Sequence, residues 1–326
     1  MPDRHTKILI LGGGPAGAAA AMTLARLGHA PLLVSAPRRQ PAIEGFSDRT
    51  MQALETLGFA RALDETGPKV GRQAFWGGGE ARVNEEFVVD RAPFDAALLA
   101  DASDKGTEVI VDRALRVTRA QGHWLVQMAS SAVISADFLV EARGRAAPVP
   151  SRERLQGPAT VSLARAWQGV DETPATAVAG MRDGWSWYAS AGGGRAMLQF
   201  LVSAEPGDLP NRHGLAAFYD KLLAAADLPR AWVAGGEPVG DVVVRRANPI
   251  GANHPLGKDF IRIGDAAVAP DPLSGHGVYV ALGSAQAASK TWRTDDIQGR
   301  WRKVLNYLRL AQAHLVHAHA IQRCGF

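Results

Sequence analysis

The chain has 326 residues, 47% of them hydrophobic, with a formal net charge of +4 and a pI near 9.4. This length can bury a large core in one elaborate domain or in two interleaved domains. Basic residues are scattered, so we expect no nucleic-acid partner. The one cysteine, Cys324, excludes an intrachain disulfide and fits a reducing cytoplasm, where we expect the protein. No apolar run is long enough to predict stable insertion into a membrane.

The chain opens with a pattern typical of dinucleotide binding. An apolar run, Ile8–Leu11, precedes the glycine-rich segment Gly12–Gly17, and an alanine-rich helix is predicted over Ala18–Leu27. In such a unit, backbone N–H groups at the helix N-terminus bind a pyrophosphate. Gly12 would permit the tight turn, and Gly14 the close approach of the phosphates. The cofactor contacts predicted here are Gly12, Gly14, Pro15, Ala16 and Gly17.

The second predicted strand, Pro31–Val34, ends without the acidic residue that usually binds the adenosine ribose. Ser35 stands there instead, and Arg38 and Arg39 follow. An arginine at this place suits a 2′-phosphate, so an NADP-binding domain is an alternative to an FAD-binding one. Arg49, on the next predicted helix, could contact the cofactor or form a surface ion pair.

In the middle of the chain, short stretches of alternating polar and apolar residues replace the continuous apolar runs, which is typical of half-buried strands. A glycine-rich aromatic patch at residues 75–79 suits a loop or a strand edge, and a helix is expected to end near Ala102. Residues 115–135 predict an antiparallel meander that ends with a short strand at Val133–Ser135. Phe138–Val140 is predicted as a separate buried strand.

Between about residues 148 and 248, alternating strands that carry aromatic side chains predominate. Trp185 and Trp187 share one face of such a strand, and Tyr188 points the other way. The two tryptophans could form the wall of an aromatic-substrate pocket or belong to an ordinary sheet core. A helix is predicted over His213–Leu228.

A second strand–turn–helix unit follows, with a strand at Phe260–Ile263 and a helix from about Val278. In a flavin site, Asp265 would accept a hydrogen bond from a ribitol hydroxyl, and the helix N-terminus would face the pyrophosphate or the flavin edge. An NADP enzyme has no need of this second cradle, so the pair of cradles favours FAD. His276 could donate to the flavin or be a spacer between glycines. The predicted contacts here are Gly264, Asp265, Pro272, Gly275, His276 and Gly277.

These elements predict an α/β fold: a Rossmann-like FAD-binding domain of the glutathione-reductase type, an inserted antiparallel α+β substrate domain and a C-terminal helix over Gly299–Ile321. The predicted FAD-binding domain comprises residues 1–67, 91–148 and 249–326, and the substrate domain comprises 68–90 and 149–248. On the terminal helix only His314 and His317 would share a face, and no further ligand follows at suitable spacing. We therefore expect no metal site.

The chain resembles the p-hydroxybenzoate-hydroxylase-like FAD-dependent flavoproteins, a superfamily of aromatic hydroxylases, flavin-dependent halogenases and prenyl reductases. Its sequence is most similar to the halogenase-like branch, which includes maturation flavoproteins that hydroxylate a protein tryptophan to build a quinone cofactor. The resemblance implies that Arg91 contacts FAD, and Arg49 lies at another position that contacts FAD in the family. It is carried by the opening glycines, by Asp90-Arg91 with Phe94-Asp95 and Leu98, by Glu141–Arg145 and by Ile261–Gly277.

Departures from the family pattern leave the reaction open. Arg143 stands where single-component aromatic hydroxylases carry an aspartate tied to NADPH handling, so the electron donor could be NAD(P)H or a separate reductase. Halogenases carry Trp-x-Trp-x-Ile-Pro and a catalytic lysine. Here Trp185 and Trp187 remain without the Ile-Pro, and Lys69 is the only candidate lysine. Tyr279 is instead typical of prenyl reductases.

The resemblance implies a monooxygenase in which reduced FAD and O₂ form a C4a-hydroperoxide that hydroxylates an electron-rich ring. The substrate would be an aromatic small molecule or a tryptophan within a peptide or protein. The alternatives are a reductase or saturase, a halogenase, and a flavin-binding partner subunit without turnover of its own. The catalytic candidates are His276, Trp185, Trp187 and Lys69.

Overall fold

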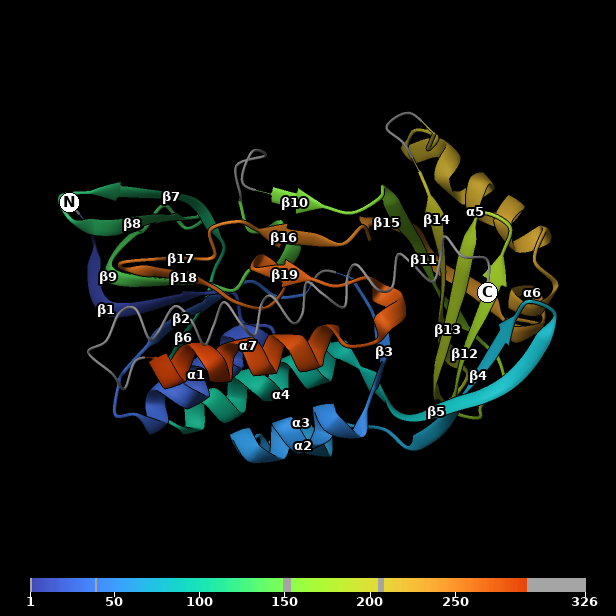
Figure 1. Ribbon diagram of the computed structural model, residues 1–326, viewed down its shortest axis with the longest axis horizontal. Helices are drawn as coiled ribbons and strands as arrows, with labels where there is room; N and C mark the ends of the chain where they lie inside the picture. Colours follow the sequence, from blue (N-terminus) through green and yellow to red (C-terminus); the bar gives the residue numbers. More distant parts are fainter. Residues whose placement is uncertain (1, 39, 149–153, 205–207, 292–326) are drawn as a thin grey trace.

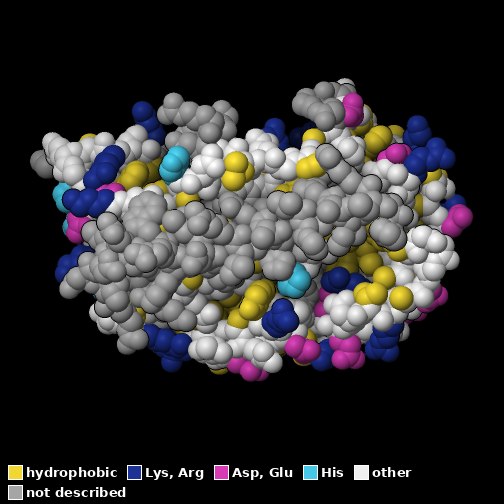
Figure 2. Space-filling model, in the orientation of Figure 1, with side chains coloured by type: hydrophobic (Ala, Val, Ile, Leu, Met, Phe, Trp, Pro, Cys, Tyr) yellow, Lys and Arg dark blue, Asp and Glu magenta, His cyan; other side chains and the backbone are white. Residues whose placement is uncertain are grey.

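The computed structural model describes residues 2–38, 40–148, 154–204 and 208–291 (Figure 1). The predicted helix over Gly299–Ile321, with His314 and His317, lies outside these residues, as do Arg39 and Cys324. None of the helices in the described ranges is long and apolar enough to cross a membrane. On the face drawn in Figure 2, the described Lys and Arg side chains are interspersed with Asp and Glu rather than gathered in one patch.

The first layer is an eight-stranded sheet with the order β17-β18-β9-β1-β2-β6, to which the β7–β8 hairpin adds beside β9. The core strands β18, β9, β1, β2 and β6 run parallel. The opening and late motifs therefore follow strands whose carboxyl ends lie at one edge of the sheet, with the end of β9 between them. The strands are β1 (Arg4–Leu11), β2 (Leu32–Ser35), β6 (Glu108–Val111), β7 (Ala114–Ala120), β8 (His123–Met128), β9 (Val133–Glu141), β17 (Leu256–Gly257) and β18 (Phe260–Arg262).

Helices pack on one face of this sheet (Figure 1). Ile8 and Ile10 of β1 meet them, whereas Leu9 and Leu11 pack on the opposite face with β8 and β9. Both faces of β1 are buried, which explains its continuous apolar sequence. The small side chains of Ala18–Ala21 are buried in the core that α1 shares with α4 and α7. The helices are α1 (Pro15–Arg26), α2 (Asp48–Leu57), α3 (Ala60–Asp64), α4 (Arg91–Asp104) and α7 (Gly277–Thr291).

The second layer is an eight-stranded sheet with the order β15-β11-β14-β13-β12-β4-β5-β3. All its pairs are antiparallel except β12 with β4. Its outer face is covered by α5 (Leu215–Ala224) and α6 (Asp227–Trp232) (Figure 1). The strands are β3 (Ile43–Phe46), β4 (Lys69–Trp76), β5 (Gly79–Asp90), β11 (Thr160–Gln168), β12 (Ala175–Met181), β13 (Gly184–Gly192), β14 (Arg195–Ser203) and β15 (Glu237–Arg246).

A small sheet, β10-β16-β19, completes the fold with strands at Arg154–Gln156, Ile250–Ala252 and Val268–Ala269. The predicted α/β fold with an antiparallel second sheet is confirmed. The domain division stays a prediction: β3, which it assigns to the FAD-binding domain, pairs with β5 of the second sheet.

Two predicted elements were wrong. Val133–Ser135 and Phe138–Val140 form one strand, β9, because β1 pairs along nearly its whole length and the intervening Asp137 points to solvent. The helix predicted over His213–Leu228 divides into α5 and α6. Pro229 lacks the N–H that would bond to the carbonyl of Ala225, so one continuous helix is disfavoured.

Candidate functional site

The opening glycine segment forms a cradle at the end of β1. Gly12 has φ +107°, and a Cβ at Gly12 or Gly17 would overlap a backbone carbonyl. These two glycines are required by the fold itself. Gly14 differs, because a Cβ there would meet no atom within 4 Å. Gly14 precedes α1, whose N-terminus has no capping side chain, so the cap leaves the first N–H groups of the helix to another acceptor. This arrangement fits a pyrophosphate.

Ser35 and Arg38 line the neighbouring end of β2. Ser35 is buried, and its hydroxyl lies where a Cβ on Gly13 would be. Arg38 Nε donates to Asp95 Oδ2 at 2.8 Å, so this guanidinium already has a carboxylate partner. Arg49 is exposed on α2 and forms no ion pair with any described residue, so the surface ion pair considered from sequence is absent there.

Arg91 lies at the start of α4 and is buried. Its Nη1 donates to both oxygens of Glu44 at 2.8–2.9 Å, and its Nη2 donates to Asp95 Oδ1 at 2.8 Å. Burial lowers the pKa of Arg91, but the carboxylates of Glu44 and Asp95 outweigh burial and raise it. The guanidinium thus ties α4 to β3, and through Asp95 it also fixes Arg38.

The late motif packs directly against the opening one. Gly264 has φ +56°, and a Cβ there would lie 2.7 Å from the Cβ of Ala16 in the first turn of α1. The backbone N–H of Gly264 donates to Ser284 Oγ of α7 at 2.8 Å. Two motifs almost 250 positions apart therefore form one continuous surface, as a cofactor longer than a mononucleotide requires.

Asp265 lines a recess in this surface. Its side chain is 35% exposed, yet burial among protein atoms raises the pKa of its carboxyl, which Arg145 partly offsets from 3.7 Å. Arg145 is held by the carbonyls of Asn248 (2.6 Å) and Pro270 (3.2 Å). A carboxylate in such a recess is stabilised by hydroxyl donors, so Asp265 suits the polyol chain of a flavin.

The loop between Asp271 and α7 connects this cradle to the second sheet. Asp271 accepts from the backbone N–H of Leu273 at 2.9 Å, and Gly275 has φ +64°. Gly277 faces open space where α7 begins, and His276 beside it is exposed. Residues 272–277 thus form a loop that leads into α7, as the sequence predicted. Their contact with a cofactor stays a prediction.

The two tryptophans share the sheet face that meets this loop. Trp185 is 5% exposed and packs in one cluster with Leu273. The guanidinium carbon of Arg72 lies over the Trp187 ring, 4.8 Å from the ring centroid. Tyr188 lies on the opposite face against Trp232. The predicted shared face is confirmed. The sequence missed an ion pair beside Trp187, in which Arg72 donates to the buried carboxylate of Glu86 (1% exposed) at 2.5 and 3.1 Å.

Lys69 lies apart from these groups. Its ammonium pairs with Asp48 (3.0 Å) and Glu85 (3.3 Å), and the hydrogen bonds to both raise its pKa. Arg143 is also engaged in an ion pair, since it donates to the buried carboxylate of Glu141 at 2.5 and 2.9 Å.

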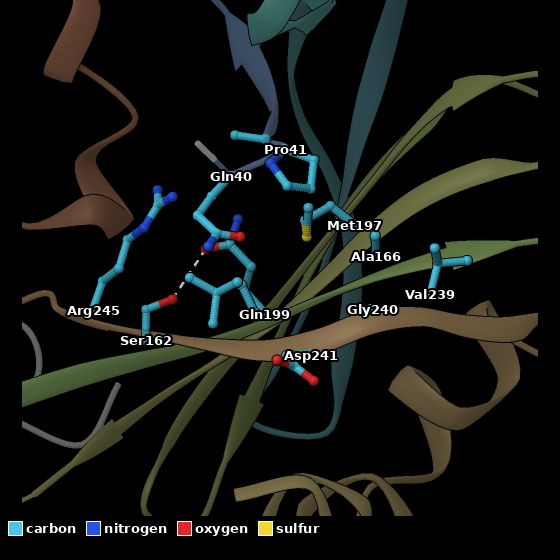
Figure 3. A pocket seen from close by; sticks show the side chains of 13 residues that line it. Gln40, Pro41, Ser162, Ala166, Met197, Gln199, Val239, Gly240, Asp241 and Arg245 are labelled. Atoms are coloured by element: carbon cyan, nitrogen blue, oxygen red, sulfur yellow. Dashed lines mark hydrogen bonds between the residues drawn. The ribbon is translucent and has the colours of Figure 1, made fainter. Parts of the chain in front are cut away.

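Sequence reasoning also missed a cavity of about 280 Å³ on the same face of the second sheet (Figure 3). No motif marks it. The only signal is a row of small side chains at alternate positions of β11, which leaves space above the sheet. Its walls are Gln40, Pro41, Ala42, Ser162, Ala164, Ala166, Met197, Gln199, Val239, Gly240, Asp241, Val243 and Arg245.

The comparisons with known proteins agree with this geometry. The model of the FAD binding domain family matches residues 5–162. The solved structure titled peptidyl tryptophan dihydroxylase QhpG, essential for tryptophylquinone cofactor biogenesis, is 37% identical and superposes with a TM-score of 0.84, covering 96% of this chain and 72% of that one. The menaquinone reductase of Mycobacterium tuberculosis (strain ATCC 25618 / H37Rv) is 25% identical over 93% of this chain and 80% of its own length. The tryptophan 2-halogenase of Chondromyces crocatus is 26% identical over 87% and 60%.

Fold, cradle and relatives define an FAD-dependent oxidoreductase. The chain belongs to the p-hydroxybenzoate-hydroxylase-like superfamily of FAD-dependent flavoproteins, in its halogenase-like branch, and its cofactor is FAD.

Proposed function

We propose that this protein is an FAD-dependent monooxygenase that hydroxylates an aromatic ring, with a tryptophan of a peptide or protein as its substrate. The observation that carries the proposal is the 37% identity, over nearly the whole chain, to a protein named as a peptidyl tryptophan dihydroxylase. The tryptophan-bearing face of the second sheet supports the proposal, because Trp185 and Trp187 pack in one cluster with Leu273 of the late loop. An aromatic ring bound at this face would lie beside the loop that we expect to contact the flavin.

Bound FAD, once reduced, supplies the activation of O₂ that such a reaction needs. The chain itself supplies binding and shape. The N–H groups beyond Gly14 would hold the pyrophosphate, and Asp265 would accept a hydrogen bond from the ribitol. Trp185 and Leu273 pack together and exclude water where the loop meets the sheet.

We propose that electrons come from a separate reductase. Arg143, which replaces the aspartate of single-component hydroxylases, is bound to Glu141 and to the carbonyl of Ala114 at 3.2 Å. Because its side chain is a cation that donates hydrogen bonds and accepts none, Arg143 cannot replace a carboxylate in NADPH handling.

A quinone or prenyl reductase is the second candidate, favoured by the 25% identity to a menaquinone reductase. Halogenation is disfavoured because the only candidate lysine, Lys69, is held by two carboxylates and does not line the cavity. A partner subunit without its own turnover remains the third alternative.

The test is a single-turnover assay on the FAD-loaded protein, reduced with dithionite and mixed with oxygenated buffer, bromide and a tryptophan-containing peptide. Mass spectrometry of the peptide should detect one added oxygen atom, because one reduced FAD can deliver only one oxygen of O₂ to the ring and the other leaves as water. A brominated peptide would identify a halogenase. An unmodified peptide, together with saturation of a menaquinone analogue, would identify the reductase instead.

A further inference from the structure

The cavity has two chemically different ends (Figure 3). Polar side chains gather at one end, where Ser162 Oγ donates to Gln199 Oε1 at 3.1 Å and Arg245 extends beside Gln40. The other end is formed by Met197, Ala166 and Val239. A ligand that fits both ends combines an apolar group with a polar or charged one.

Arg245 supplies the charge at the polar end. Arg245 is exposed at the surface of β15, but the protein atoms around its guanidinium, and then Arg38, lower its pKa; an arginine still stays charged at neutral pH. No described carboxylate lies within 4.0 Å of its guanidinium, whereas nearby Arg38 and Arg91 are both paired with Asp95. A guanidinium that lines a cavity without a carboxylate partner is free to bind one, and such a pair gains charge-assisted hydrogen bonds.

The acidic residue of the cavity does not serve as this partner. Asp241 lies at the rim, 89% exposed, and its carboxylate is 3.5 Å from Arg212. Arg245 lies instead near Arg38, Glu44 and Arg91, whose charges all influence its pKa.

The size of the cavity limits what can enter. About 280 Å³ is at the lower end of the range for ligand pockets, so it takes one ring system or two small side chains rather than a whole peptide. Its opening lies beside β15, an edge strand of the second sheet, so a longer substrate can extend into solvent.

We propose that this cavity is a specificity subsite for a carboxylate-bearing aromatic substrate, in which Arg245 binds the carboxylate and Met197, Ala166 and Val239 contact the adjoining apolar group. Its assignment to the substrate rests on the proposed function. In the proposed substrate the carboxylate comes from an acidic residue next to the tryptophan of the peptide. A preference for a free aromatic acid would contradict the peptide substrate and leave the subsite intact.

The test is calorimetric titration of the FAD-loaded protein, which requires no turnover. One pair of probes is indole-3-propionate and its neutral amide, and the other is acetyl-Asp-Trp-amide and acetyl-Asn-Trp-amide. In the pair that matches the natural substrate, we expect the acid to bind about tenfold or more tightly than its neutral partner, because it gains one charge-assisted hydrogen-bonded pair. The pair with the larger preference identifies the source of the carboxylate.

Variants locate the preference. Arg245→Gln should abolish it while retaining the full flavin load. Arg246→Gln is the matched control, because Arg246 follows on the same strand and faces the other side of the sheet, and it should keep the preference. Ala166→Leu should weaken both members of a pair alike by filling the apolar end.

Three results would overturn the subsite: equal binding of acid and neutral probe, a preference that survives in Arg245→Gln, or loss of flavin from that variant, which would assign Arg245 to the cofactor. Failure to hydroxylate a probe that binds through Arg245 would contradict the proposed function and leave the subsite intact.

Discussion

The flavin cradle and the tryptophan-bearing face of the second sheet, which carries Trp185 and Trp187, are built by different means. In the cradle, backbone conformation makes the site: Gly12 and Gly264 adopt positive φ, and Gly14 leaves open space at the N-terminus of α1. On the tryptophan-bearing face, side chains form the surface: Arg72 covers Trp187, and Glu86 pairs with Arg72. A backbone site tolerates few residue types at fixed spacing, whereas a side-chain site depends on which strands become neighbours.

The largest effect is expected on the tryptophan-bearing face. Arg72→Met should lower the free energy of unfolding by about 3–5 kcal/mol, because it leaves the Glu86 carboxylate buried and unpaired. The double variant Arg72→Met/Glu86→Met should regain most of this loss, as measured by urea unfolding. A single variant as stable as the wild type would show that the pair does not organise this face.

In the cradle, the same substitution should have different effects at neighbouring positions. Gly12→Ala should lower the free energy of unfolding by about 3 kcal/mol, since it combines a positive φ with overlap onto Ala142. Gly14→Ala should leave stability unchanged and weaken FAD binding, because its Cβ would project into the space for the phosphates. Thermal unfolding and flavin titration separate the two effects. Equal stability losses would contradict the assignment of distinct roles.

Asp265 should show a pH signature. Its pKa is raised in the folded protein, so the folded state holds the proton more tightly and the free energy of unfolding of the flavin-free protein falls as the pH rises above the ordinary aspartate range. Asp265→Asn should abolish this fall, so flavin-free variant and wild type should be alike at low pH and the variant more stable at neutral pH. The variant should also bind FAD about tenfold more weakly, as expected for one lost hydrogen bond to a charged group. Parallel stability curves for the two proteins would contradict this account.

The smallest effect is expected on the far side of the second sheet. Tyr219 is buried, donates to the carbonyl of Leu198 at 3.1 Å and accepts from Trp167 Nε1 at 3.3 Å. Tyr219→Phe should lower the free energy of unfolding by about 1 kcal/mol and leave flavin binding unchanged. A change in the flavin spectrum would mean that the outer face communicates with the cofactor.

What the sequence could predict follows the same division. The two glycine segments, the helices after them and the shared face of Trp185 and Trp187 depend on local spacing, and the structure has them where they were expected. The contact of Gly264 with Ala16 was only implied by the two cradles. Arg245 and the cavity could not be foreseen, because residues 40–42 reach β11 and β15 only through the tertiary fold. The long strand β9 was missed because Asp137 interrupts its apolar pattern.

We expect the opening and late segments to hold one FAD together. The decisive measurement is the visible absorption spectrum of the purified protein after reconstitution with FAD and removal of free flavin, alongside Gly14→Ala and Asp265→Ala. The wild-type chain should retain one FAD, and each variant should lose a marked part of it. A wild-type protein that retains no flavin, or variants that keep the full load, would show that these segments do not form the FAD site.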